Sequence, residues 1–113
     1  MPRWRNWSGR LEARPTEVRF LRSEADGVAL VQQAAAGGSR MRVVGSGHSH
    51  APLVPTDGIV VDVSGLSGVI DTDGGNRTAR VRAGTPIHAL GRPLHDAGLA
   101  LRNQGDIDRQ TIA

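Results

Sequence analysis

Apolar and polar positions near the start of the chain predict a strand followed by a helix. Residues 18–21 read Val-Arg-Phe-Leu, and this brief alternation is typical of a half-buried strand. Ser23 then precedes acidic residues, which favour the first turn of a helix because they complement its positive end. Small and apolar residues follow at helical spacing, and Gly37-Gly38 supplies a stop. We therefore expect a helix over residues 24–36.

Two further apolar segments extend this pattern. Residues 41–44 read Met-Arg-Val-Val and predict a second strand. Residues 59–63 are almost continuously apolar, which suits a strand covered on both faces, as in a parallel sheet. The order strand, helix, strand, loop, strand is that of a βαβ unit. The first half of the chain is therefore expected to form a small parallel sheet with a helix packed on it.

The second half predicts antiparallel and helical structure. Residues 69–71 and 79–83 flank an Asp-Gly-Gly-Asn stretch that adopts positive φ at low cost, so this pair predicts a β-hairpin. Thr85-Pro86 is expected to be an N-cap and first helical residue, opening a helix that Gly98 ends. Residues 99–101 suggest a last short strand.

The predicted domain organisation is simple. Residues 1–16 are polar, contain two tryptophans and are interpreted as an extended N-terminal arm. Residues 17–113 are expected to form one α/β unit, because a chain of 113 residues holds at most one domain.

Charge and composition exclude several function classes. All 14 basic residues are arginines, scattered among 11 acidic ones, so the net charge is only +3. This scatter and the lack of tyrosine argue against a nucleic-acid partner. With no cysteine, disulfides and thiolate metal sites are excluded. No apolar run approaches the ~18 residues of a transmembrane segment, and no apolar leader is visible. We expect a cytoplasmic protein, with peripheral membrane association left open.

The most informative segment is Val43-Val44-Gly45-Ser46-Gly47-His48-Ser49, directly after a predicted buried strand. Glycines there let the backbone approach a ligand closely, and consecutive amides can form a nest for an anion such as a diphosphate. The Gly-Lys-Ser/Thr of a Walker A loop and the third glycine of the dinucleotide fingerprint are absent. A plain glycine turn between two strands stays open as an alternative.

Metal binding and hydrolysis are weaker interpretations. His48 and His50 form a His-x-His pair, but His88 and His95 would lie about 10.5 Å apart along one continuous helix. Such a pair cannot share one zinc ion, whose ligands each lie about 2 Å from it. Ser46 and Ser49 lie near His48, but the Gly-x-Ser-x-Gly elbow of a hydrolase is missing.

Several motifs along the whole chain resemble one family. They are Trp4-x-x-Trp7-Ser8-Gly9, Val44-Gly45-Ser46-Gly47-His48-Ser49, Thr56-Asp57-Gly58-x-x-Val61-Asp62, Val81-x-Ala83-Gly84 and Asn103-Gln104-Gly105-Asp106-Ile107-Asp108-x-Gln110-Thr111-Ile112-Ala113. Together they resemble the N-terminal part of the FAD-linked oxidases of the vanillyl-alcohol oxidase superfamily. Within it, the sequence is most similar to the D-arabinono-1,4-lactone and L-gulono-1,4-lactone oxidases.

The resemblance implies a PCMH-type FAD-binding subdomain of α/β class, with a small parallel sheet, packed helices and a β-hairpin. It also implies FAD as cofactor, held around its diphosphate by the loop, with later contacts from the C-terminal segment. The implied cofactor-binding residues are Val43, Val44, Gly45, Ser46, Gly47, His48, Ser49, Asp106 and Thr111. In this family the histidine equivalent to His48 is often joined covalently to the 8α-methyl carbon of the flavin.

The resemblance further implies oxidation of a sugar-1,4-lactone, with hydride passing to the flavin and then electrons to oxygen or another acceptor. The family's catalytic and substrate-binding residues lie in segments downstream of those matched here, so none is expected in this chain. We therefore expect weak FAD binding and no turnover by these 113 residues alone. The alternative is a non-enzymatic anion-binding or interaction module that shares the glycine loop.

Overall fold

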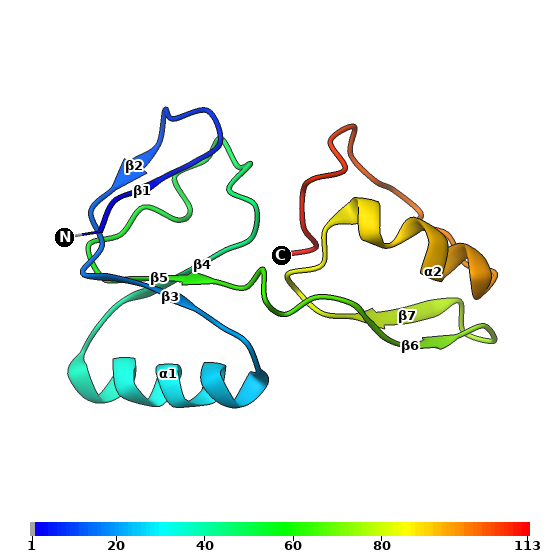
Figure 1. The fold of residues 1–113 in the computed structure, drawn as a ribbon, viewed down its shortest axis with the longest axis horizontal. Helices are drawn as coiled ribbons and strands as arrows, with labels where there is room; N and C mark the ends of the chain where they lie inside the picture. Colours follow the sequence, from blue (N-terminus) through cyan, green and yellow to red (C-terminus); the bar gives the residue numbers. More distant parts are fainter. Residues whose placement is uncertain (1) are drawn as a thin grey trace.

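The computed structural model describes residues 2–113 and divides them into two lobes joined by a short connection (Figure 1). Its principal extents are 46 × 31 × 18 Å. The elements are β1 (Trp4–Arg5), β2 (Glu12–Ala13), β3 (Glu17–Phe20), α1 (Glu24–Gly37), β4 (Met41–Val44), β5 (Ile59–Asp62), β6 (Val69–Asp73), β7 (Thr78–Val81), the short 3-10 helix η1 (Ile87–Ala89) and α2 (Gly91–Asp96).

The first lobe is built on the predicted parallel sheet. Its strand order is β3-β5-β4, and β5 pairs in parallel with both neighbours. Val60, fully buried, lies between Val18 of β3 and Arg42 of β4. The central strand is the most apolar of the three because it is covered on both faces, as the sequence predicted. The α/β fold class and the βαβ unit are thereby confirmed.

Helix α1 connects β3 to β4 and covers one face of the sheet (Figure 1). The Ser23 hydroxyl accepts a hydrogen bond of 3.1 Å from the Asp26 N–H, so the predicted N-cap is confirmed. The helix ends as predicted, with Gly38 in the left-handed region at φ 67°. Leu30 and Ala34 of α1 pack with Leu21 and with the side chains of Ile59, Val61 and Val63 in the main hydrophobic core.

The other face of the sheet is covered by the N-terminal residues and the loop after β4. Val44, Val54 and Val60 form a second buried cluster, and Trp4 packs against it. Residues 1–16 were predicted to be an extended arm, but residues 4–13 within them form an antiparallel hairpin of β1 and β2. Met1, the first residue of that predicted arm, lies outside the described residues. The domain boundary before residue 17 stays a prediction.

The second lobe confirms the β6–β7 hairpin and corrects the predicted helix after it. The strands β6 and β7 pair antiparallel. The predicted single helix is divided into η1 and α2, and Thr85 is not its N-cap. The Thr85 hydroxyl instead donates to the Arg82 carbonyl and accepts from the Gly68 N–H, at 2.6 and 2.9 Å. Residues 99–101, predicted as a strand, form none.

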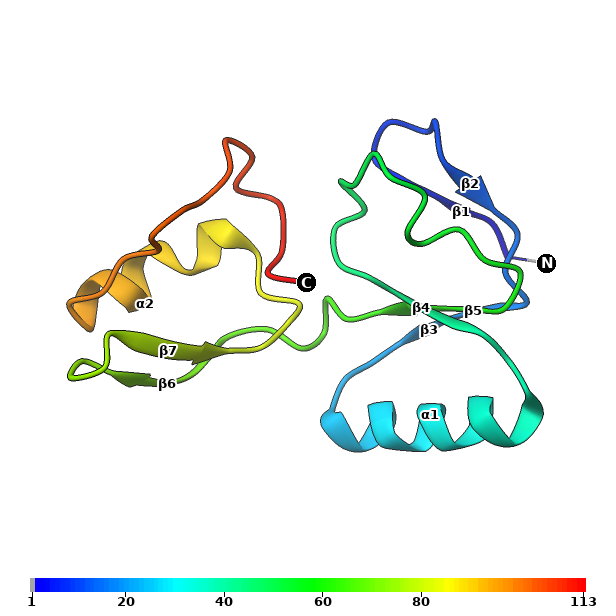
Figure 2. The ribbon, with the colours of Figure 1, turned by 180° about the vertical axis from the view of Figure 1, so that it is seen from behind.

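The C-terminal segment returns from the second lobe toward the first, as the reverse view shows (Figure 2). Residues 110–113 run beside the start of η1, where the Ile87 N–H donates to the Gln110 carbonyl at 2.8 Å. The Ile112 and Ala113 N–H groups donate to the carbonyls of Thr85 and Ala83. This segment thereby brings the second lobe into contact with the loop that follows β4.

Candidate functional site

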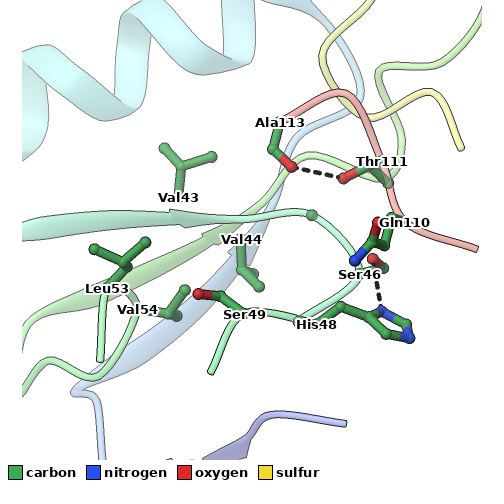
Figure 3. Close-up of a pocket in the computed structure, with 12 residues that line it drawn as sticks. Val43, Val44, Ser46, His48, Ser49, Leu53, Val54, Gln110, Thr111 and Ala113 are labelled. Carbon is green, nitrogen blue, oxygen red and sulfur yellow. Dashed lines mark hydrogen bonds between the residues drawn. The ribbon is translucent and has the colours of Figure 1, made fainter. Parts of the chain in front are cut away.

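The predicted glycine loop leaves β4 at the carboxyl edge of the parallel sheet, beside the C-terminal segment (Figure 3). A cavity of about 310 Å³ lies between them. Its lining comes from residues 43–49, from Leu53 and Val54, and from Gln110, Thr111 and Ala113. In open α/β sheets, ligands bind outside the carboxyl ends of the strands. The chain therefore places its glycine loop where such folds bind small molecules.

The backbone of the loop presents hydrogen-bond donors without partners. The N–H groups of residues 45–49 donate to no other residue among residues 2–113. Gly47 has φ 70°, which lets the chain turn back sharply at that point. Successive free amides in such a turn form an anion-binding concavity. The loop thus offers a main-chain site for a phosphate group.

Close approach at Gly45 explains why a glycine stands there. A Cβ on this residue would overlap the Thr111 hydroxyl, and it would lie 3.1 Å from the Ala113 carbonyl oxygen. The Thr111 hydroxyl in turn donates to that carbonyl at 2.9 Å. The loop and the C-terminal segment therefore come together only because residue 45 has no side chain.

His48 is held by contacts on two sides. Its Nδ1 lies 3.0 Å from the Ser46 hydroxyl oxygen. Its ring is stacked on Trp7, with centroids 5.6 Å apart and planes 14° apart. The ring of His50 also contacts Trp7, edge-on, with ring centroids 5.6 Å apart. These contacts fix an imidazole at one side of the cavity.

Among residues 2–113, no Lys, Arg, Asp or Glu side chain lines the cavity. The apolar part of its lining includes Val43, Val44, Leu53 and Val54, while the polar part is main chain, hydroxyl, imidazole and amide. Any anion held here is therefore stabilised by backbone dipoles, without a lysine or arginine.

The structure brings together all the predicted site residues except Asp106. Val43, Val44, Gly45, Ser46, Gly47, His48, Ser49 and Thr111 line the cavity, whereas Asp106 is exposed and does not. Sequence reasoning did not single out Leu53, Val54 or Gln110. The available signal was the apolar pair Leu53-Val54 shortly after the loop, because the chain that leaves the loop runs back past the cavity at these two residues.

The histidines do not assemble a metal centre within the described part of the chain. No group of three or more metal-ligating side chains lies together among residues 2–113. His88 belongs to η1 and His95 to α2, both in the second lobe. Over the same residues, no helix is both long and apolar enough to cross a bilayer.

Free amides in a glycine turn at the edge of a parallel sheet define a nucleotide-phosphate-binding class of α/β protein. Comparison with known proteins gives the family within that class. Residues 15–113 match the family described as FAD binding domain. The chain belongs to this family, and FAD is its cofactor. This membership sets aside the alternative of a cofactor-free module.

Several of the relatives that match are sugar-lactone enzymes. The chain is 40% identical over 111 residues to an L-gulono-1,4-lactone dehydrogenase of Mycobacterium tuberculosis, covering 98% of this chain and 26% of the relative. It is 36% identical over 113 residues to a D-arabinono-1,4-lactone oxidase of Eremothecium gossypii, covering 96% of this chain and 21% of the relative. The chain thus spans about a quarter of the length of the curated relatives it matches.

A solved structure supports the fold. The crystal structure of aclacinomycin oxidoreductase superposes with a TM-score of 0.77 and 26% identity, covering 96% of this chain and 22% of that one. The PCMH-type assignment made from the sequence motifs is therefore confirmed.

Proposed function

We propose that residues 43–49 and 110–113 bind the diphosphate of FAD, in an oxidoreductase whose substrate is a sugar-1,4-lactone. The observation that carries this proposal is the run of backbone N–H groups at residues 45–49, which have no partner among residues 2–113 and border a cavity that these residues line without Lys, Arg, Asp or Glu. The missing Cβ at Gly45 lets Thr111 and Ala113 approach the loop closely, so that residues 110–113 form the opposite wall of the cavity.

The residues present fit the cofactor in chemistry as well as in space. A diphosphate is an acceptor-only anion, and the loop offers donors in sequence on one short segment. Bound FAD supplies the two-electron acceptor for oxidation of a carbinol carbon. The chain's part is to bind and orient it: the loop amides hold the diphosphate, and Val44, Leu53 and Val54 exclude water along one wall.

We place His48 against the flavin end of the cofactor and propose it as the point of covalent attachment. Its position is fixed by Ser46 and Trp7, so it needs little reorganisation to meet a ligand in the cavity. Asp106 would contact the cofactor only if residues 103–109 moved toward the loop. We therefore assign the contact from the C-terminal segment to Thr111 and keep Asp106 as the weaker candidate.

The lactone substrate is proposed from the relatives, and it is tested most directly with a chimera. Residues 1–113 replace the matching quarter of the M. tuberculosis dehydrogenase, and the chimera is purified with FAD. We expect flavin absorption after gel filtration and reduction of an artificial dye that depends on L-gulono-1,4-lactone. A colourless chimera that reduces no dye, next to an active parent enzyme, would contradict the proposal.

A second experiment uses the 113-residue chain alone. We expect it to retain FAD weakly and to show no lactone-dependent dye reduction, because no catalytic residue is assigned to it. Turnover by the isolated chain would show that a reaction centre exists within residues 1–113.

A further inference from the structure

The hairpin of β1 and β2 lies before residue 15, where the match to the FAD binding domain family begins. Nothing in that match assigns it a role. The hairpin nevertheless makes a set of hydrogen bonds to the glycine loop that follows β4. In each of those bonds the loop supplies a backbone carbonyl oxygen as the acceptor.

Three consecutive carbonyls of the loop are bound by two residues of the hairpin. The Trp7 N–H donates to the Gly47 carbonyl at 2.9 Å, and the Trp7 indole Nε1–H donates to the His48 carbonyl at 3.1 Å. The Asn6 side-chain amide donates to the Ser49 carbonyl at 3.2 Å. The hairpin therefore supplies a hydrogen-bond donor to each of these three carbonyls.

Peptide geometry then fixes where the donors point. The described part of the chain has no cis peptide bond, and in a trans peptide the C=O of one residue points opposite to the N–H of the next. With the carbonyls of Gly47 and His48 turned to the hairpin, the N–H groups of His48 and Ser49 turn away from it. No hairpin residue lines the cavity, and both His48 and Ser49 do.

Asn6 is built into the hairpin while it reaches the loop. It is almost fully buried, at 5% exposure. Its Oδ1 accepts from the Leu11 N–H at 3.1 Å and from the Ser8 hydroxyl at 3.2 Å, which leaves its amide nitrogen for the Ser49 carbonyl. Trp7, by contrast, is 54% exposed, so its ring contributes little to a core and its bonds go to the loop.

We propose that Trp7 is a positioning residue for the cofactor and that Asn6 supports it: Trp7 holds the carbonyls of Gly47 and His48 outward, so that the N–H groups of His48 and Ser49 face the FAD diphosphate, while Asn6 anchors the Ser49 carbonyl at the end of the loop. This inference rests on the proposed FAD site. It makes the β1–β2 hairpin part of the cofactor site, although neither residue touches the cofactor. Trp7 also orients the imidazole of His48, because the two rings are stacked.

Two variants and one matched control test this role in the 113-residue chain. Trp7→Phe keeps an aromatic ring for stacking on His48 and removes the Nε1–H donor. Asn6→Asp keeps the oxygen that Leu11 and Ser8 use and removes the donor to Ser49. Glu12→Gln changes the same hairpin away from the loop, where Glu12 bridges Arg3 and Arg5 on the surface.

FAD affinity is measured by the quenching of flavin fluorescence, and stability by thermal unfolding without ligand. We expect FAD affinity to fall about fivefold in Trp7→Phe, as for loss of one net hydrogen bond. We expect a fall of at least about tenfold in Asn6→Asp, because a carboxylate then faces the Ser49 carbonyl and adds negative charge beside a loop that binds an anion. Glu12→Gln should bind within about twofold of the original chain, because exposed ion pairs contribute little. The unfolding midpoint of Trp7→Phe should stay within a few degrees of that of the original chain.

The 31P NMR signals of FAD at saturation separate positioning from simple destabilisation. A variant with displaced loop amides should move the bound diphosphate signals toward those of free FAD, whereas a merely less stable variant leaves them in place once saturated. Unchanged affinity and unchanged 31P shifts in Trp7→Phe would overturn this inference and leave the proposed FAD site in place. If Asn6→Asp fails to fold, the result for Trp7→Phe alone decides whether the inference holds. An original chain that does not bind FAD would overturn the proposed function as well.

Discussion

Replacing Gly45 by alanine should affect both stability and cofactor binding. The new Cβ would overlap the Thr111 hydroxyl and lie 3.1 Å from both the Thr111 Cβ and the Ala113 carbonyl oxygen. The hydroxyl can rotate away, but the Cβ and the backbone oxygen move only if residues 110–113 move. Overpacking of this kind costs about 1–3 kcal/mol. We expect a loss of about 2 kcal/mol in the free energy of unfolding, within that range.

The magnitude follows from how firmly the displaced segment is held. Three backbone hydrogen bonds attach residues 110–113 to the second lobe, so the segment cannot shift without straining them. The same displacement reshapes the wall of the cavity formed by Gln110 and Thr111. We therefore expect FAD affinity to fall at least about tenfold, which corresponds to about 1.4 kcal/mol.

Urea unfolding followed by circular dichroism measures the stability, and flavin fluorescence measures the affinity. Gly74→Ala is the matched control, because a Cβ there meets nothing within 4 Å and the site is on the β6–β7 turn. A Cβ at Gly47 would make only ordinary contacts, the shortest 3.7 Å to the Trp4 ring, but φ is 70°, so Gly47→Ala should cost about 1–2 kcal/mol from the left-handed backbone alone. If Gly45→Ala matched Gly74→Ala in both measurements, the close approach of the two segments would be refuted.

Three further predictions concern single side chains. Thr85→Val should lower the free energy of unfolding by about 1–3 kcal/mol in urea titrations, because Thr85 is fully buried and its loss leaves the partly buried Gly68 N–H without an acceptor; a loss below about 0.5 kcal/mol would contradict this. Hydrogen bonds from the backbone and side chain of Asn76 lower the pKa of Asp73, so its NMR titration midpoint should lie below 3.8. The stability it contributes is present above that value and lost as pH falls through the lowered pKa; a midpoint at or above 3.8 would show that these bonds are absent in solution. In the chimera, acid-precipitated protein should keep its flavin, and His48→Ala should release it; flavin retained by His48→Ala would place the covalent bond elsewhere.

The βαβ unit was predictable because its signals are local. Ser23 caps α1 through the Asp26 N–H three residues away, and Gly38 ends it within the same turn of chain. The apolar run at residues 59–63 reflects burial on both faces, so it indicates a central parallel strand without knowledge of the neighbours. The glycine loop was likewise visible because its residues are contiguous.

The failures came where distant contacts decide local structure. Thr85 and Pro86 have the sequence of a helix start, but the Thr85 hydroxyl binds Gly68, 17 residues earlier, and the helix begins later. The β1–β2 hairpin has only two residues per strand, too few for alternation to be recognised. It is held by hydrogen bonds from Asn6 and Trp7 to loop residues that lie 43 and 41 positions further along the chain, respectively.

The central claim is that the amides of residues 45–49 bind the FAD diphosphate, and amide-resolved NMR tests it directly. Titrating the 15N-labelled chain with FAD, and separately with ADP, should shift the N–H signals of residues 45–49 most strongly. Residues 110–113 should follow, and α1 should change little. If both ligands left the 45–49 signals in place while those elsewhere moved, the cofactor would bind at another site.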